Sequence, residues 1–303
     1  MTRNPSAARR QLIYKWLFLL PVICYVSMFF FFPVLTNLEQ SFRGSTIQTF
    51  LRGNAPFIGF DNYAAIFNEP LFWRAVANTA IFTVVSLVGQ FVIGFTFAVY
   101  FNRRFALNRL FRALLLLPWL LPLVVSGTIF RWALDQDHGV FNAILVNVGL
   151  ASEGVPWLSD PQIALLSVTL VNIWVGIPFV FVTLYGGLQG IPDDVIEAAK
   201  IDGAGAIRVF WSITLPLLRP VILVVQLLGL IYTIRAFDLI ILLTQGGPAN
   251  STQTLATLSY FRSFTTFDFG QGSAISNILI VVAMVFALLY IRVTNSEKWK
   301  VSQ

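Results

Sequence analysis

Long apolar runs alternate with short polar segments along the whole chain. A helix needs about 20 mostly apolar residues to cross the hydrocarbon core of a bilayer. Six runs reach or approach that length with few charged residues inside them, which predicts an all-α integral membrane protein with six transmembrane helices. We expect these spans at residues 16–35, 76–101, 113–130, 163–188, 217–243 and 274–291.

The first apolar run resembles a signal peptide because Arg9, Arg10 and Lys15 precede it. It is longer than the usual apolar region of such peptides, and Thr36-Asn37-Leu38 offers no small-residue cleavage site. We therefore expect the segment to remain as a membrane anchor.

The composition agrees with this pattern. Hydrophobic residues make up 57% of the 303 residues and charged residues 11%, whereas soluble domains carry about a quarter charged residues. The sequence has no repeat of fixed period and no low-complexity tract, which argues against a solenoid or a disordered arm. We interpret residues 1–303 as a single membrane domain.

The distribution of Lys and Arg predicts the orientation, because short loops rich in these residues stay in the cytoplasm. If both termini and the second and fourth loops share one side, that side holds fourteen basic residues and the other side five. Both termini are therefore predicted to be cytoplasmic, and the net charge of +6 reflects topology rather than nucleic-acid binding. The fourteen are Arg3, Arg9, Arg10, Lys15, Arg103, Arg104, Arg109, Arg112, Lys200, Arg208, Arg219, Arg292, Lys298 and Lys300, and the five are Arg43, Arg52, Arg74, Arg131 and Arg262.

Cys24 and His138 are each the only residue of their type. A disulfide or multi-cysteine metal site within one chain is excluded. Metal ligands come in groups, so we interpret His138 as an ordinary residue of the loop between the third and fourth spans. We expect no metal and no cofactor in this chain. The sequence also has no HExxH or G-x-S-x-G motif, and we expect no enzyme activity.

The predicted cytoplasmic loop at residues 189–216 keeps a helical pattern. Pro192 suits the first position of a helix, the two aspartates after it suit the positive end of the helix dipole, and Gly203 suits the residue beyond the end. A second short helical stretch is expected at Ala206–Ile213, and Pro216 is expected to open the fifth span. From the pattern alone, the first helix either rests on the inner leaflet or docks a partner protein.

A motif in this loop resembles a known family. Three residues separate Glu197-Ala198-Ala199 from Gly203, nine residues follow before Ile213, and Leu215-Pro216 comes one residue later. This spacing is similar to the signature loop of the permease subunits of bacterial binding-protein-dependent ABC importers, written EAA, x3, G, x9, I, x, LP. Every fixed position matches.

Other segments resemble the carbohydrate-uptake branch of that family, whose members carry maltose-type sugars and glycerol phosphate. Each segment is weak alone, and their order and spacing carry the resemblance. They are Phe57–Tyr63, Gly139–Asn142, Ala199–Ala204, Phe237–Leu239 and Leu243–Pro248.

The resemblance implies an assembly in the bacterial inner membrane. It would comprise this chain, a second homologous permease, a dimer of ABC ATPase subunits that bind ATP and Mg, and a periplasmic solute-binding protein that delivers a sugar or a sugar derivative. The signature loop would be a coupling helix that docks into the ATPase. This chain contains no Gly-Lys dipeptide and therefore no G-x-x-x-x-G-K-[ST] phosphate loop, so the ATPase activity is expected in the partner.

The alternative is a self-contained secondary transporter or channel, in which ionisable residues inside the membrane would relay ions. Only Arg235 and Asp238 lie clearly within a predicted span, and no inverted repeat is apparent. That class would also leave the signature loop unexplained.

The resemblance also places a substrate site on the fourth and fifth spans. Four of its residues are spaced i, i+3, i+4, i+7, which places them on one face of a helix. The alternative is ordinary helix packing, since Gly, Ala and Thr also let membrane helices approach closely, and the other permease of a pair can be the one that contacts substrate. The six implied residues are Gly176, Phe179, Gly229, Tyr232, Thr233 and Ala236, the last four forming the helical face.

Arg235 needs its own explanation, because an arginine at the centre of a membrane helix costs about 2.5 to 3.5 kcal/mol on insertion scales. Two interpretations stay open. In one, Arg235 pairs with Asp238 at i, i+3 and stabilises the helix end. In the other, its planar set of donors binds substrate, and an anionic group would suit it best.

Overall fold

The computed structural model describes residues 5–103 and 105–301, so Arg3 and Arg104 of the orientation argument lie outside the described residues. Regular secondary structure in this part of the chain is helical, with β pairing limited to two isolated bridges. The elements are α1 (Pro5–Val26), the π-helical turn η1 (Ser27–Phe31), α2 (Phe32–Ser41), α3 (Ile47–Arg52), α4 (Asp61–Phe67), α5 (Pro70–Phe101), α6 (Asn108–Leu115), α7 (Leu117–Leu120), α8 (Leu123–Ala133), α9 (Val140–Asn147), α10 (Ala164–Gln189), α11 (Asp193–Ile201), α12 (Ala206–Val209), η2 (Phe210–Thr214), α13 (Leu215–Ile234), α14 (Asp238–Leu243), α15 (Leu255–Tyr260), η3 (Phe261–Thr265) and α16 (Phe269–Val301).

Five helical segments among the described residues are long and apolar enough to cross a membrane, and a bent pair of helices would make a sixth. The prediction of an all-α chain with membrane-length helices is confirmed, and the exact number of spans stays a prediction. The five segments are Lys15–Ser41, Pro70–Phe101, Ala164–Gln189, Ala206–Ile234 and Phe269–Arg292.

The predicted third span, at 113–130, is not one straight helix. Helical residues Asn108–Leu120 and Leu123–Ala133 meet at an angle of 97°. Pro122 causes the break, because proline lacks an N–H and forces the residue before it out of the helical region. Leu121 accordingly has extended backbone angles, with φ −78° and ψ 134°.

The predicted fifth span, at 217–243, differs from the structure at both ends. The helix begins at Ala206 rather than near Pro216. The π-helical turn η2 comes directly before Leu215-Pro216, so the helix continues through the proline, which has no N–H to donate. It ends at Ile234, and α14 starts only at Asp238. Arg235 and Ala236 therefore lie beyond the end of α13, and the predictions that placed Ala236 on one helical face with Gly229, Tyr232 and Thr233, and Arg235 within one helix with Asp238, are wrong.

The contacts divide the chain into two compact units, Met1–Asn68 with Ser259–Asn277, and Glu69–Leu258 with Ile278–Gln303. In the first unit Asn62, from the Phe57–Tyr63 segment, is buried and donates to the backbone oxygens of Ser41 and Arg43 at 2.8 and 2.9 Å. The Tyr63 hydroxyl lies 2.9 Å from the Ser41 hydroxyl. This motif segment therefore fixes the chain that follows α2.

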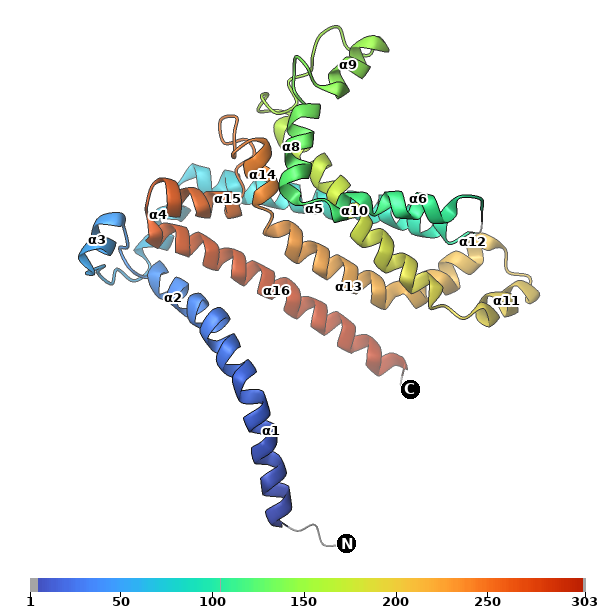
Figure 1. Cartoon of the computed structure of the whole chain (residues 1–303), viewed down its shortest axis with the longest axis horizontal. Helices are drawn as coiled ribbons and strands as arrows, with labels where there is room; N and C mark the ends of the chain where they lie inside the picture. Colours follow the sequence, from blue (N-terminus) through green and yellow to red (C-terminus); the bar gives the residue numbers. More distant parts are fainter. Residues whose placement is uncertain (1–4, 104, 302–303) are drawn as a thin grey trace. The chain divides into compact units, whose positions relative to one another are not determined.

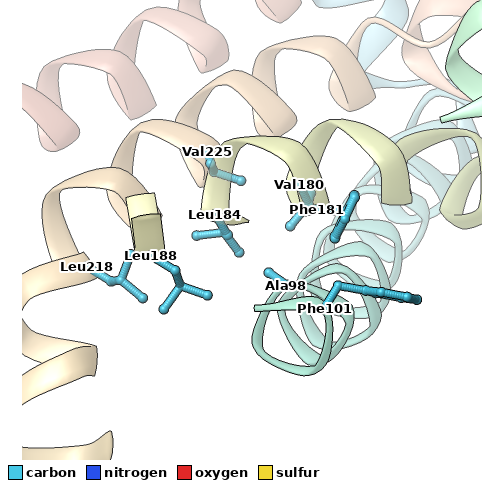
Figure 2. Packing of buried hydrophobic residues seen from close by; sticks show 8 residues of the cluster. All are labelled: Ala98, Phe101, Val180, Phe181, Leu184, Leu188, Leu218 and Val225. Carbon is cyan, nitrogen blue, oxygen red and sulfur yellow. The ribbon is translucent and has the colours of Figure 1, made fainter. Parts of the chain in front are cut away.

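In the second unit α5, α10 and α13 pack against one another (Figure 1). Their contact faces are apolar, and the side chains that meet there are buried (Figure 2). The cluster consists of Ala98, Phe101, Val180, Phe181, Leu184, Leu188, Leu218 and Val225.

A second apolar cluster in the same unit holds α14 in place. Leu239, Ile240 and Leu243 of α14 pack with Phe82 of α5 and with residues of α10. These contacts fix the start of α14, and with it the non-helical residues 235–237 that connect α13 to α14.

Candidate functional site

A cavity of about 390 Å³ lies where α10, α13, α14 and the bend before α8 come together in the second unit. All seven residues that the sequence analysis assigned to substrate line it. Its lining residues are Gln90, Trp119, Leu123, Asn172, Val175, Gly176, Phe179, Gly229, Tyr232, Thr233, Arg235, Ala236, Phe237, Asp238 and Leu239.

Two glycines in the cavity lining lie close to side chains of a neighbouring helix. The side-chain amide of Gln90 lies against Gly176, where a β-carbon would fall well inside van der Waals contact. A β-carbon at Gly229 would lie 3.0 Å from Leu87 Cδ2. Substitution at either position would push neighbouring side chains aside.

Three aromatic rings form one part of the wall. Phe179 lies between Trp119 and Tyr232, with ring centroids 6.3 Å apart in both pairs and near-perpendicular ring planes. Trp119 and Tyr232 are exposed, with 56% and 67% of their surface accessible. Exposed rings beside hydrogen-bonding groups are suited to an amphipathic molecule such as a sugar.

Two amide side chains also line the cavity. Gln90 is buried, 5% exposed, and its Nε2 donates to the backbone oxygen of Asn172 at 3.0 Å. The Asn172 side chain donates to the Ser86 hydroxyl at 2.9 Å. These bonds fix both amide groups. The sequence analysis missed Gln90, Asn172 and Trp119, although an amide within an apolar span is itself a signal of function in a membrane protein.

Arg235 and Asp238 are both exposed and both line the cavity. Arg235 terminates α13 with φ −95° and ψ 4°, and Asp238 begins α14. In the described part of the chain no ion pair joins Arg235 to Asp238, so the predicted pair is absent there. Because the backbone leaves the helix between the two residues, the i, i+3 geometry of that pair does not exist.

The predicted coupling helix corresponds to α11. Pro192 stands just before the helix, with extended angles of φ −61° and ψ 133°, rather than at its first position. The predicted end is confirmed: Gly203 has φ +79°, and the N–H groups of Gly203 and Ala204 donate to the oxygens of Lys200 and Ala199. These two bonds form a Schellman motif, in which a residue with positive φ ends the helix.

The signature residues are not equally accessible. Most of them are exposed and available to another protein, while Ala199 and the two apolar positions before Pro216 are half-buried. The exposed ones are Glu197, Ala198, Gly203 and Pro216, and the half-buried ones are Ala199, Ile213 and Leu215.

A cavity of about 900 Å³ lies beside the start of α11. Asp193 and Ile196 line it together with three arginines of the preceding segments, Arg103, Arg109 and Arg112. Arg112 donates to the Tyr185 hydroxyl, and its guanidinium carbon lies 4.9 Å from the Tyr185 ring centroid. Three arginines therefore lie beside the acidic first turn of α11.

The loop that contains His138 is held by local hydrogen bonds. The backbone N–H groups of His138 and Asp137 donate to the Asp135 carboxylate at 2.8 and 3.1 Å. The bond from His138 is the largest factor that holds the pKa of Asp135 below its ordinary value, because it favours the charged form. The possible metal-ligand atoms of Asp135, Asp137 and His138 lie within 4.8 Å of one another, and all three residues are exposed. The Asp135 carboxylate already accepts the two backbone hydrogen bonds of this turn.

Comparison with known proteins identifies the class. Residues 90–295 match the family described as binding-protein-dependent transport system inner membrane component. The chain belongs to this family of transport permeases, as the signature loop predicted.

Individual relatives extend over nearly the whole chain. The sulfoquinovosyl glycerol transport system permease protein of Agrobacterium fabrum is 35% identical over 281 residues, 93% of this chain and 90% of the relative. The trehalose/maltose transport system permease protein of Thermococcus litoralis is 35% identical over 278 residues, 92% of each chain. A chain of a bacterial ABC transporter that imports the acidic polysaccharide alginate has a TM-score of 0.82 at 24% identity and is covered to 98%, against 96% of this chain. That likeness shows a shared fold.

Proposed function

We propose that this chain is a permease subunit of an ABC importer that moves a sugar or a sugar derivative. Family membership and two sugar-transport relatives of full length support the proposal. The observation that carries it is that the seven residues assigned to substrate from the sequence meet in one cavity with three aromatic rings and two fixed amides.

In this proposal the chain works with a second permease, a dimer of ABC ATPases that holds ATP and Mg, and a periplasmic binding protein. The coupling contact is made by Glu197, Ala198, Ala199 and Gly203 of the α11 segment. Ile213, Leu215 and Pro216 continue the signature into the fifth span. The whole chain acts as one transmembrane domain, and hydrolysis takes place on the partner.

The proposed topology has six spans, with both termini and α11 in the cytoplasm of a bacterial inner-membrane protein. The imbalance of basic residues supports it. Reporter fusions after Gln48, Gly154 and Asn250 are expected to be periplasmic, and fusions after Arg104 and Lys200 cytoplasmic. One reversed reporter contradicts this topology.

Reconstitution tests the function directly. The permease pair and its ATPase are placed in proteoliposomes with the binding protein outside, and uptake of labelled sugars is measured. We expect uptake to require both internal ATP and the binding protein. Uptake that continues without ATP and follows an imposed proton or sodium gradient would instead establish the secondary transporter.

A labelling experiment tests the cavity. Cys24 is the only cysteine, so a Cys24→Ser background carries no other thiol. Thr233→Cys in this background is expected to react with a small maleimide more slowly when the transported sugar is present at saturating concentration. Tyr100→Cys is the control, because Tyr100 is exposed outside the lining of the cavity. Equal reaction rates with and without sugar at position 233 would place the substrate elsewhere.

A further inference from the structure

The substrate cavity contains a cation, Arg235, that forms no ion pair with a described side chain. Arg235 lines the cavity and is exposed. Among the described residues it forms no side-chain hydrogen bond either, and Asp238, which lines the same cavity, is not paired with it. We propose that Arg235 binds an anionic group of the substrate, so that the transported molecule is an acidic sugar derivative carrying a carboxylate, sulfonate or phosphate. This inference rests on the proposed function of the cavity.

The chemistry of arginine favours an anion over a neutral hydroxyl. The guanidinium presents five N–H donors in a planar arrangement and stays charged at all physiological pH values. A ligand that fills the cavity displaces the water that hydrates these donors. A hydroxyl can accept one bond, but it leaves the charge uncompensated. A carboxylate, sulfonate or phosphate accepts two parallel bonds and balances the charge, and such bonds are about twice as strong as neutral ones.

Asp238 does not act as the anionic partner of Arg235 in place of the substrate. Arg235 closes α13 and Asp238 opens α14, with Ala236 and Phe237 outside both helices. A cation is favourable at the end of a helix and a carboxylate at the start, so each charge is stabilised where it stands. The carboxylate is left to accept bonds from sugar hydroxyl groups.

The other lining residues fit the same arrangement. Phe179 and Tyr232 provide faces for the ring of the sugar, and hydrogen bonds hold the amides of Gln90 and Asn172 in the same lining. The acidic group of the substrate would then point toward the gap between α13 and α14. The cavity thus distinguishes one end of the molecule from the other by charge.

Direct binding to the assembled importer tests the inference without interference from the specificity of the binding protein. Saturation-transfer NMR on the purified permease and ATPase complex would compare glucose, glucuronate and 6-deoxy-6-sulfoglucose. Charge-assisted bonds lead us to expect each acid to bind about tenfold more tightly than glucose. Arg235→Gln should remove this preference, and Arg235→Lys should keep only part of it because lysine lacks the planar donor pair. Arg131→Gln, at the last turn of α8 and outside the cavity, is the matched control.

The outcomes separate the two proposals. Glucose that binds as tightly as both acids, acids that do not bind, or a preference that survives Arg235→Gln would overturn the anion inference. Tyr232→Ala tests the cavity itself, and it should weaken all three probes. If Tyr232→Ala changes the binding of none of them, the cavity is not the substrate site and the proposed site fails with it.

Discussion

The side-chain amide of Gln90 lies directly against the α-carbon of Gly176, so that α5 and α10 meet at the cavity without room for a methyl group. Gln90 is buried, and its Nε2 donates to the backbone oxygen of Asn172. Gly176 lies within the regular helix α10, so the position requires glycine for its lack of a side chain and not for an unusual backbone conformation.

Gly176→Ala is expected to displace the Gln90 amide and break its bond to Asn172. A buried polar group left without its partner costs about 1–3 kcal/mol. We expect a lower melting temperature of the detergent-solubilised protein together with reduced substrate uptake. Gly186→Ala is the matched control in the same helix, because no atom lies within 4 Å of the added carbon. It should stabilise the helix by up to about 1 kcal/mol. Equal melting temperatures for the two variants would contradict the close packing.

Several residues that line the cavity could be predicted from the sequence, but their geometry could not. Gly176, Phe179 and Tyr232 were placed by their distance along the sequence from the signature loop, and all three line one cavity. The end of α13 at Ile234 carries no proline or glycine signal, so the pattern predicted an uninterrupted apolar helix. The packing of α14 against α5 and α10 determines where α13 ends and α14 begins. Such contacts between distant segments cannot be read from the local sequence pattern.

The bend in the third span had a local signal in the sequence, Pro122. The prediction of one straight span gave more weight to the length of the apolar run. Trp119 lies just before this bend and reaches the cavity because of it. A straight helix over 113–130 gives no reason to assign Trp119 to the site. Gln90 and Asn172 were missed for another reason, since their role depends on a contact between two spans far apart in the sequence.

The end of the proposed coupling helix provides a second prediction. Gly203 has φ +79° and Gly205 has φ −68°, and both are exposed with no atom within 4 Å of an added β-carbon. Gly203→Leu must adopt a left-handed conformation that costs about 1–2 kcal/mol, whereas Gly205→Leu meets no such strain. We expect only the first variant to lose ATPase association and transport.

Membrane abundance must be measured with both variants, because an unfolded loop can also stop transport. Normal abundance with lost ATPase association in Gly203→Leu supports the coupling role. Full transport by Gly203→Leu would show that this helix end is not part of the coupling contact.

Asn142 supports a third prediction, because it is buried and organises its loop. Its Nδ2 donates to the backbone oxygens of Asp135, Gln136 and Val155, and its Oδ1 accepts from the Val155 N–H at 3.2 Å and from Trp157 Nε1 at 2.8 Å. Asn142→Ala leaves several of these groups without partners. We expect faster hydrogen exchange at the Val155 amide and faster proteolysis of the loop.

Asn147 lies on the same helix, α9, and is exposed, so Asn147→Ala is the matched control and should exchange like the wild type. The same exchange rate in Asn142→Ala and Asn147→Ala would show that the hydrogen bonds of Asn142 do not hold the loop.

The final prediction concerns Tyr232, the exposed ring that meets Phe179 at the cavity wall. Tyr232→Ala removes an aromatic face, and we expect substrate uptake to fall about tenfold or more, as at other central aromatic contacts. Stimulation of ATP hydrolysis by the binding protein should persist, because the α11 segment is unchanged. Tyr232→Phe keeps the ring and should retain most uptake if stacking is the main contribution. Loss of both activities together would indicate misfolding, which membrane abundance would reveal. Wild-type uptake by Tyr232→Ala would move the substrate contacts to the partner permease, since the cavity of this chain would then be a gap between packed helices without a ligand.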